Sequence, residues 1–448
     1  MTMLQSPDEL VLNDVNYALI SFVELNGFSR AKLVPMSVLS SVKEHGAGFA
    51  GFAAGDIGQG PHDPDLVAIP DLGSMQRVPW REDVCWFASD LYVEGRSWPY
   101  CPRTTAKRVL RMAQEKGYRF MVGMEPEFFL LRKGGDGRLE PADPLDMEAK
   151  PCYNQQSIFR NLDFITRLVD AMNRLGWGVY QCDHEDANGQ FEINWAYTEA
   201  LEQADRLTFA RFLIRSLAEE QGLIATFMPK PFSRLTGNGA HCHVSLWDEK
   251  TGRNLFLPEG GAEGNPLALS DIGRWFIGGL LAHARALAAF TTPTVNSYKR
   301  LWASTTDSGA TWAPVYVTYG GNNRTVMLRI PGEGRVEYRA VDGAVNPYLA
   351  LAAIVAAGLD GIERQIDPGP PFAGNAYKLT WADASERGMT VLPRTLKEAL
   401  EALDGDEVLT EALGPDLVSL YLEVKEREWR EYHASVSEWE VERYLHLG

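Results

Sequence analysis

The 448-residue sequence predicts a mixed α+β protein in which a small β-rich domain precedes a larger one. Two domains are expected because a chain of this length exceeds what one hydrophobic core usually organises. Apolar and polar residues alternate between residues 15 and 40 around Asn26-Gly27, which is typical of a β-hairpin. After residue 100, segments with strand periodicity alternate with segments of helical periodicity, and this indicates the mixed class.

The first domain contains a glycine-rich segment, residues 46–63, which we expect to form a mobile loop. Prolines interrupt the chain at Trp98-Pro99-Tyr100-Cys101-Pro102, and a segment with helical spacing begins soon after them. We therefore place the domains at residues 1–100 and 101–448.

The second domain is expected to contain both helices and strands. The apolar segment 276–290 carries His283 and Arg285 and is too short for a membrane span, so it predicts a buried helix. Helical spacing predicts further helices over 104–117, 156–175, 198–221 and, as surface helices, from residue 396 onward. Strands are expected over 119–131, 178–182, 190–194, 241–247, 326–330 and 335–340.

Composition excludes several functional classes. The net charge of -17 opposes binding to nucleic acid, which needs a positive field. The five cysteines form no C-x-x-C pair, and their odd number argues against a disulfide framework. Acidic residues stand where a signal peptide would need basic ones, so we expect a cytoplasmic protein without a membrane segment.

Candidate site residues occur in pairs two positions apart, which places both side chains on one face of a strand. These pairs are Glu125-Pro-Glu127, His241-Cys-His243 followed by Ser245, and Glu337-Tyr-Arg339. Any one pair fits the solvated face of an antiparallel sheet. Together they favour a site for metals and anions, because Glu, His and Arg bind such ligands whereas solvated faces are rich in Lys, Ser and Thr.

Two further acids, Glu185 and Glu192, flank the turn signal Asn188-Gly189, which suggests that both carboxylates reach one point. A site of carboxylates with one or two imidazoles suits Mg²⁺ or Mn²⁺ better than zinc. Several such ions with nearby arginines are what phosphoryl transfer requires. The sequence contains no G-x-x-x-x-G-K-[ST] loop, so a nucleotide would not be held in the P-loop manner.

Arginines cluster in three neighbouring segments, at Arg300, Arg324 and Arg329. A guanidinium suits a bidentate grip on carboxylate or phosphate. Any one of these arginines fits equally well in a weak ion pair at the surface.

In this order along the chain, the motifs resemble those of the glutamine synthetase family, and in particular its type III-like members and the γ-glutamylmethylamide synthetases. The motifs are Glu125-Pro-Glu127-Phe-Phe, His184-Glu185 through Glu192, residues 226–231 (TFMPKP), residues 237–245 (GNGAHCHVS), Asn296-Ser-Tyr-Lys-Arg300, Asn323-Arg324 and Glu337-Tyr-Arg339. The resemblance covers roughly residues 15 to 448. It implies an N-terminal β-grasp domain and a catalytic domain whose curved antiparallel sheet forms a funnel.

The resemblance also implies a set of ligands. Two to three Mg²⁺ or Mn²⁺ ions per site are expected, with ATP as co-substrate. One ion is expected on Glu127, Glu185 and Glu192, and a second on Glu125, His241 and Glu337. The resemblance further implies two stacked hexameric rings, a dodecamer, whose active sites are shared between neighbouring subunits.

Substrate contacts follow from the same resemblance. Glutamate is expected on Arg300, Arg339 and the backbone of Gly237, and the transferring phosphate on Arg324 and Arg329. Nucleotide contacts are expected from His243, Ser245 and Arg335, and amine contacts from Tyr153 and Trp312. Asp56 of a neighbouring subunit is the candidate base that deprotonates the amine.

The sequence departs from the family at three places. Gly332-Glu333-Gly334 stands where bacterial members carry a lysine before the counterpart of Arg335. Lys378 replaces the acid that follows an adenylylated tyrosine, so we expect no such modification at Tyr377. Trp312 precedes Ala313-Pro314, where ammonia-using members have a glutamate that encloses the ammonium ion, and the loop before it is longer.

The resemblance implies an ATP-dependent ligase that joins the γ-carboxylate of L-glutamate to a small amine, and the departure at Trp312 predicts that methylamine is preferred. The alternatives are ammonia, as in glutamine synthetase itself, and polyamines, as in a γ-glutamyl-polyamine ligase. A catalytically inactive relative would need to have lost metal ligands, and all six ligand positions here keep an acid or a histidine.

Overall fold

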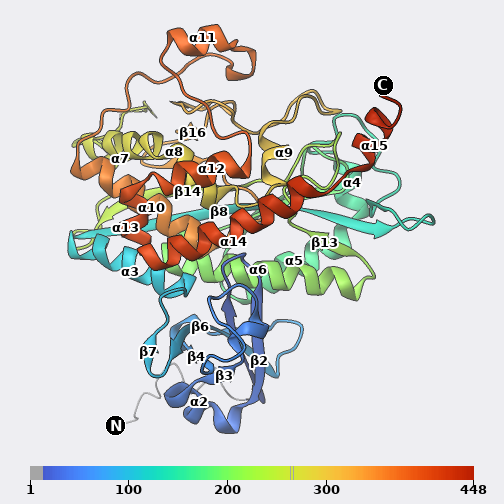
Figure 1. Cartoon of the computed structure of the whole chain (residues 1–448), viewed down its shortest axis with the longest axis vertical. Coiled ribbons are helices and arrows are strands. Elements are labelled where there is room, and N and C mark those ends of the chain that lie inside the picture. The colour runs from blue at the N-terminus through green and yellow to red at the C-terminus, as the bar shows by residue number, and fades with distance from the viewer. Residues whose placement is uncertain (1–13, 263, 266, 448) are drawn as a thin grey trace.

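The computed structural model describes residues 14–262, 264–265 and 267–447, which form two β-sheets surrounded by helices (Figure 1). The N-terminal sheet has seven strands and the second sheet has ten. In Figure 1 the N-terminal sheet lies at the bottom, beneath helices α3 (Pro102–Glu115) and α6 (Ala200–Glu220). The expected mixed fold, with a small β domain before a larger α+β part, is confirmed.

The N-terminal sheet is built on the predicted hairpin, in which β1 (Tyr17–Val23) pairs antiparallel with β2 (Ser29–Pro35). Gly27 makes the turn with a φ of 88°, a conformation that glycine adopts without steric cost. Strand β1 also runs parallel to β6 (Val84–Val93), and the strand order is β2-β1-β6-β4-β3. The remaining elements are α2 (Leu39–His45), β3 (Ala47–Phe49), β4 (Leu66–Pro70), β5 (Gln76–Arg77) and β7 (Arg96–Ser97).

The ten-stranded sheet is organised around the long strand β8 (Tyr118–Lys133), which lies between β11 (Gln190–Trp195) and β14 (Ala240–Asp248). Its order is β10-β11-β8-β14-β17-β16-β15. The other strands are β9 (Leu139–Pro141), β10 (Val179–His184), β12 (Thr198–Glu199), β13 (Ile224–Thr226), β15 (Tyr319–Gly320), β16 (Leu328–Arg329) and β17 (Val336–Tyr338). Helices α3 and α6 contact β8, and α10 (Pro347–Glu363) packs on α3.

Three expected elements differ in the structure. The helix predicted over 156–175 is two helices, α4 (Gln155–Arg160) and α5 (Leu162–Arg174), which meet at Asn161. The helix predicted over 276–290 is likewise α7 (Asp271–Ala282) and α8 (Ala284–Thr291), separated at His283. The His283 ring bonds Asp360 and Asp406 at 3.0 and 2.7 Å, contacts that lie too far along the chain for periodicity to reveal. The strand expected over 326–330 is only β16.

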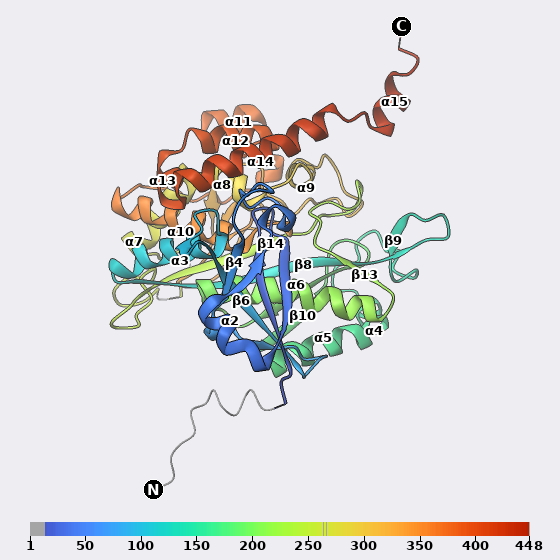
Figure 2. The same ribbon diagram turned by 60° about the horizontal axis from the view of Figure 1, so that its bottom comes forward.

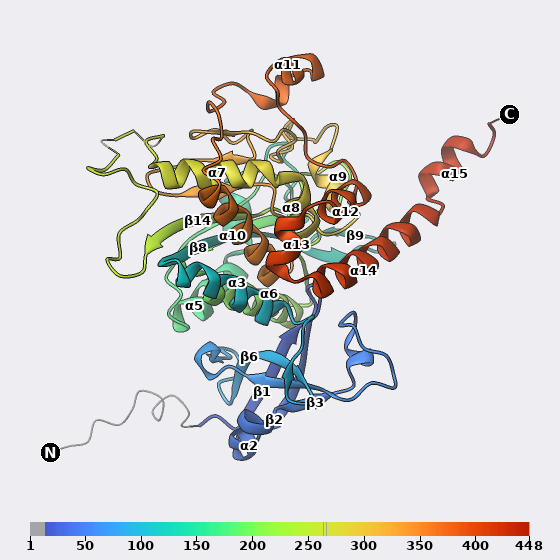
Figure 3. The same cartoon turned by 60° about the vertical axis from the view of Figure 1, so that its left-hand side comes forward.

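The last part of the chain is mostly helical, and the helices expected from residue 396 onward are present. Its helices are α9 (Ser297–Leu301), α11 (Trp381–Glu386), α12 (Leu396–Asp404), α13 (Glu407–Leu413), α14 (Pro415–Ala434) and α15 (Glu438–Tyr444). Leu396, Leu400 and Leu403 are buried, so α12 is amphipathic. Helix α15 projects away from the rest of the chain (Figures 2 and 3). None of the described helices combines the length and the hydropathy that crossing a bilayer requires.

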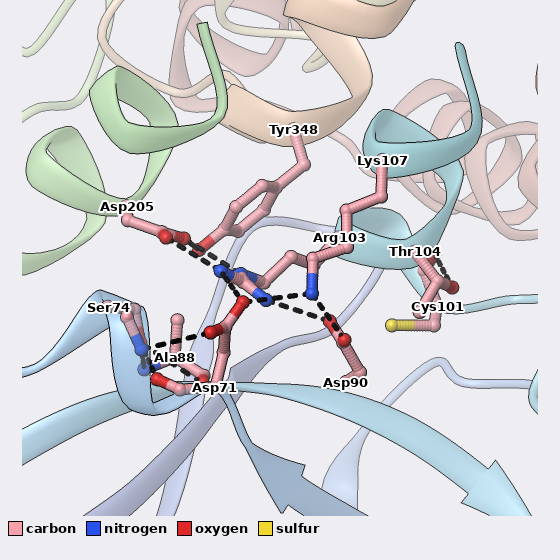
Figure 4. A network of polar contacts seen from close by, with 11 residues as sticks. Asp71, Ser74, Ala88, Asp90, Cys101, Arg103, Thr104, Lys107, Asp205 and Tyr348 are labelled. Atoms are coloured by element: carbon pink, nitrogen blue, oxygen red, sulfur yellow. Dashed lines mark hydrogen bonds and ion pairs between the residues drawn. The ribbon is translucent and has the colours of Figure 1, made fainter. Parts of the chain in front are cut away.

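A buried ion network attaches the N-terminal sheet to the second part of the chain (Figure 4). Arg103, on α3, donates to Asp205 of α6 at 2.8 and 2.9 Å and to Asp90 of β6 at 2.9 Å. It also donates to Asp71 at 3.0 Å, and Lys107 donates to Asp71 and Asp90. Burial opposes the charge of Asp71, but Lys107 and Arg103 outweigh it and lower the pKa of Asp71 to about 2.

We predict that Arg103→Met lowers the free energy of unfolding by about 3–5 kcal/mol, because it leaves the buried Asp205 carboxylate without its cation, whereas Asp71 and Asp90 keep Lys107. Urea unfolding measures the change. In the wild type, the lowered pKa of Asp71 stabilises the fold above about pH 3.8, and this contribution is lost as the pH falls toward 2. The control Arg81→Met, which removes an exposed pair with Asp83, should leave the unfolding curve unchanged.

Candidate active site

The register of three strands brings the predicted acids and histidines together. Glu125 of β8 lies opposite His241 of β14, and His243 lies opposite Glu337 of β17. On the other side of β8, Glu127 lies opposite Glu192 of β11. Directly opposed side chains in antiparallel strands lie close enough to interact. The period-two pairs of the sequence therefore converge on one region of the sheet.

Pro126 stands between the two acids of β8 and has no N–H to donate to the ladder. It faces Ala240, and the ladder resumes at the next residue, where the Glu127 N–H donates to the Gly239 carbonyl at 3.1 Å. The Glu127 carboxylate then accepts from the Gly239 N–H at 2.7 Å and from Gln190 at 3.0 Å. Both carboxylates of β8 are thus held in place by neighbouring strands.

The turn between β10 and β11 brings Glu185 and Glu192 to one point, as expected. Asp146 organises this turn, since its carboxylate accepts from the Gly189 N–H at 2.6 Å and lies 2.7 Å from His184 Nε2. Oxygens of Asp183, Glu185 and Glu192 then lie within 4.8 Å of one another.

Asp183 is a candidate metal ligand that the sequence reasoning missed. It stands two positions before Glu185, which is the same spacing that marks the other pairs. It also lies opposite Glu192 in the sheet.

The imidazoles lie against two of the carboxylates. His243 Nε2 is 2.9 Å from Glu125, and His241 Nδ1 is 3.8 Å from Glu125 and 3.5 Å from Glu337. Despite burial, these two histidines hold the pKa of Glu125 far below its usual range. Glu337 is fully buried, yet Arg339 and the two histidines lower its pKa to about 2.

The other carboxylates repel each other. Burial, together with the charges of Glu127 and Asp183, raises the pKa of Glu185 to about 8. Burial and the charges of Glu185 and Glu125 raise the pKa of Glu192 well above its usual value. This part of the site therefore has an excess of negative charge that a cation would neutralise.

The donor set fits divalent cations. Three groups have ligand atoms within 4.8 Å of one another: Glu125, Glu192 and His241; Glu125, His243 and Glu337; Asp183, Glu185 and Glu192. His241 Nε2 is buried and has no hydrogen-bond partner within the described part of the chain. Oxygen donors with an imidazole suit Mg²⁺ or Mn²⁺. Glu127, whose carboxylate is engaged by Gly239 and Gln190, belongs to none of these groups.

Most of the predicted residues line one cavity of about 570 Å³. Those on its wall are Glu125, Glu127, Tyr153, Glu185, Glu192, His241, His243, Trp312, Arg324, Arg329, Arg335 and Arg339. A second cavity of about 500 Å³ shares Glu125, Tyr180, His243 and Arg335 with the first and is lined by Ser245 as well. The expected nucleotide contacts therefore stand together where the two cavities meet.

Of the arginines expected to bind glutamate or phosphate, Arg329 and Arg339 form ion pairs with Glu337, and the other two do not. Arg329 donates to Glu337 at 2.8 Å, and Arg339 donates to the other oxygen of the same carboxylate at 2.5 Å. Arg324 is exposed on the cavity wall. Arg300 is only 3% exposed, and its Nη1 finds no hydrogen-bond partner among the residues described. A buried guanidinium nitrogen of this kind suits a carboxylate ligand.

Gly237 lies beside Arg300, where only glycine fits. A Cβ at Gly237 would lie 2.2 Å from the Pro229 carbonyl oxygen and 3.1 Å from Cγ of Arg300. Neither Gly237 nor Arg300 is on the wall of the larger cavity. Both nevertheless lie next to it, because Arg300 Nη2 is 3.4 Å from the Arg339 carbonyl.

Asp56 lies elsewhere in this chain. Its carboxylate accepts from Asn26 at 2.8 Å and from Arg427 of α14, and it lines a separate cavity of about 630 Å³. Within one chain it does not reach the carboxylates of β8 and β11. Its role as a base supplied by a neighbouring subunit stays a prediction.

Comparison with known proteins agrees with this geometry. The family model of the glutamine synthetase catalytic domain matches residues 99–444. The chain belongs to the glutamine synthetase family. It is an ATP-dependent ligase of that family, which joins glutamate to an amine and uses divalent metal ions.

Relatives with different names within this family are equally similar to the chain. The glutamine synthetase of Rhizobium leguminosarum bv. phaseoli is 46% identical over 97% of this chain and 97% of its own length. The glutamate–methylamine ligase of Methyloversatilis universalis is 46% identical with the same two coverages. A solved GmaS/ADP complex, 46% identical, superimposes with a TM-score of 0.91 and covers 99% of this chain and 100% of that one.

We predict that the affinity for Mn²⁺ rises with pH up to about 8, because Glu185 must lose its proton to bind the ion. The raised pKa of Glu185 also means that, without metal, this group stabilises the fold below pH 4.5 and that the contribution is lost as the pH rises to about 8. Calorimetric titration in buffers of different ionisation heat measures both affinity and proton release. An Mn²⁺ affinity that is the same at about pH 6 and about pH 8.5 would contradict this assignment.

Proposed function

We propose that this ligase joins methylamine to the γ-carboxylate of L-glutamate and forms γ-glutamylmethylamide, ADP and phosphate. The observation that carries the choice of amine is Trp312, an indole on the cavity wall in place of an anionic residue. Its Nε1 is buried and lacks a hydrogen-bond partner among the described residues, and the rest of the indole is carbon, so most of the ring surface is apolar. Tyr153 lines the same cavity.

The reaction needs two group transfers. An oxygen of the γ-carboxylate attacks the γ-phosphorus of ATP, the bond to ADP breaks, and γ-glutamyl phosphate forms. The amine nitrogen then attacks the acyl carbon, the bond to phosphate breaks, and a proton passes from the nitrogen to a base. Divalent ions, when bound, neutralise the phosphate oxygens and align the reacting groups.

The two cavities and the residues beside them suggest a role for each predicted side chain. Arg300 and Arg339, with the backbone of Gly237, would hold the glutamate, since one buried nitrogen of Arg300 has no partner in the described part of the chain. Arg324 and Arg329 would stabilise the charge of the transferring phosphoryl group. His243, Ser245 and Arg335 would contact the nucleotide, because all three line the second cavity.

The metal ligands would be Glu127, Glu185 and Glu192 for one ion and Glu125, His241 and Glu337 for the other. For Glu127 to bind the ion, its carboxylate would have to give up part of the hydrogen bonding that it receives from Gln190 and Gly239. Asp56 of a neighbouring subunit would accept the amine proton, in an assembly of two stacked hexameric rings. Residues 1–100 would form a separate domain, and this domain would bring Asp56 to the active site of the neighbouring subunit.

Methylamine is favoured over ammonia by burial of its methyl group. Removing one carbon from water is worth about 0.8 kcal/mol, or about fourfold in kcat/KM. Methylammonium and ammonium can both meet the indole face through a cation–π contact, so only the methyl term discriminates. The alternative amine is ammonia, which two relatives 46% and 47% identical, both named glutamine synthetase, support.

We predict that kcat/KM for methylamine exceeds that for ammonia, measured as ADP release with glutamate, ATP and Mg²⁺ across ammonia, methylamine, ethylamine and putrescine. Trp312→Glu should move the ratio toward ammonia by restoring an anion that encloses ammonium. The matched control is Trp302→Phe, because the Trp302 indole donates to the Pro393 carbonyl. A higher kcat/KM for ammonia in the wild type would overturn the choice of methylamine.

We predict a further separation between binding and turnover at Arg324. Arg324→Ala should lower kcat by about 100-fold or more and change KM for glutamate little, because charge on the transferring group develops in the transition state. Steady-state kinetics with glutamate as the varied substrate measure both parameters. An effect confined to KM would move Arg324 to a binding role.

A further inference from the structure

The loop that carries Trp312, residues 302–312, is fastened to the protein at several points, and Ser308 is its buried residue. Ser308 is 8% exposed, and its hydroxyl donates to the Asp186 carboxylate. The Thr236 hydroxyl donates to the same oxygen of Asp186 at 2.7 Å. We refer to Asp186, Thr236 and Ser308 as the Asp186 latch.

Asp186 is unusual because its carboxylate is buried without an ion-pair partner among the described residues. It is 7% exposed, and within the described ranges no Lys, Arg or His forms an ion pair with it. A buried carboxylate that relies on hydroxyl donors alone is costly and is retained where it fixes a conformation. Asp186 directly follows Glu185, so the latch ties the loop to the strand end that carries a predicted metal ligand.

Trp312 itself is held in a strained conformation. Its φ is 52°, in the left-handed region that bulky side chains rarely adopt. Such strain persists only where the surroundings hold the residue on several sides. On one side the Trp312 carbonyl accepts from Arg339 at 3.3 Å, and on the other side the chain is fixed four residues earlier by Ser308.

A second contact of the loop lies at the surface. The Asp307 N–H donates to the Arg234 carbonyl at 2.9 Å, and the Arg234 side chain pairs with the Asp307 carboxylate at the same distance. The Arg234 side chain is 84% exposed, so this pair contributes little to the position of the loop. The buried latch and the Arg339 contact, together with the contact of the neighbouring Thr311 side chain with Tyr377, therefore restrain the position of Trp312.

We propose that Asp186 is a positioning residue for amine specificity, which acts by holding Trp312 against the amine end of the cavity through Ser308. This inference rests on the proposed function. Asp186, Thr236 and Ser308 are absent from the cavity wall, so they do not themselves contact the substrates there. Removing a hydrogen bond of the latch should let Trp312 leave its strained conformation. The ratio of kcat/KM for methylamine to that for ammonia should then fall.

Ser308→Ala is the primary variant, because it removes one donor from the latch without changing charge. We expect it to reduce the ratio of kcat/KM for methylamine to that for ammonia at least to about parity, mainly through KM for the amine. KM for ATP and for glutamate should stay within about twofold. Asp186→Ala should act in the same direction, and Asp186→Asn, which keeps an acceptor oxygen, should retain more of the ratio. Asp307→Ala, in the same loop, should leave the ratio unchanged.

The double variant Ser308→Ala/Trp312→Ala decides whether the latch acts through the indole. Once Trp312 is alanine, the loss of Ser308 should change the ratio no further. An equal effect in both backgrounds, or equal losses of affinity for ATP and glutamate, would overturn the inference. If Trp312→Ala alters the ratio and neither latch variant does, only the latch is wrong. If Trp312→Ala has no effect on the ratio, the proposed role of the indole in the choice of amine fails and the latch inference fails with it, whereas the choice of methylamine itself is tested by the wild-type ratio.

Discussion

The active site depends on the register of one strand, β8, between β11 and β14. That register sets Glu125 against His241 and Glu127 against Glu192, and β14 in turn sets His243 against Glu337. Because side chains alternate between the two faces of a strand, a slip of β8 by one residue would turn Glu125 and Glu127 away from the ligands on β11, β14 and β17. The bonds from Gly239 and Gln190 to the Glu127 carboxylate add a second restraint on the same alignment.

This alignment concentrates charge that the protein only partly neutralises. Arg329 and Arg339 together balance Glu337, and the two histidines lie against Glu125. Among the described residues, Glu185 and Glu192 have no cationic partner, and the pKa values of both are raised. Glu125 and Glu337 therefore have stabilising partners within the folded chain. Glu185 and Glu192 would instead be stabilised by a bound cation. A site of this kind couples metal binding to proton release and to the order of the neighbouring turn.

Much of this arrangement could be predicted from the sequence, because it follows from local rules. The spacing of Glu125 and Glu127, and of His241 and His243, identifies a shared strand face without knowledge of the partner strands. The same rule would have found Asp183, had it been applied to Asp183 and Glu185. The hairpin at Asn26-Gly27 likewise follows from turn chemistry alone.

Features set by distant contacts could not be predicted in this way. The break between α7 and α8 is marked by His283, whose partners Asp360 and Asp406 lie far along the chain. The short extent of β16 and the attachment of Ser308 to Asp186 depend equally on the folded neighbourhood. Periodicity predicts which face of a segment is buried. It does not predict where that segment is interrupted or which distant residues it contacts.

The central claim is that the γ-carboxylate of glutamate is activated by phosphorylation before methylamine attacks it. It is tested most directly with glutamate labelled with ¹⁸O in the γ-carboxylate, turned over with ATP, Mg²⁺ and methylamine. Mass spectrometry of the products should show one ¹⁸O atom in each released phosphate and the other in γ-glutamylmethylamide, because the bridging oxygen of the acyl phosphate leaves with the phosphorus. Phosphate free of ¹⁸O alongside amide formation would contradict the account.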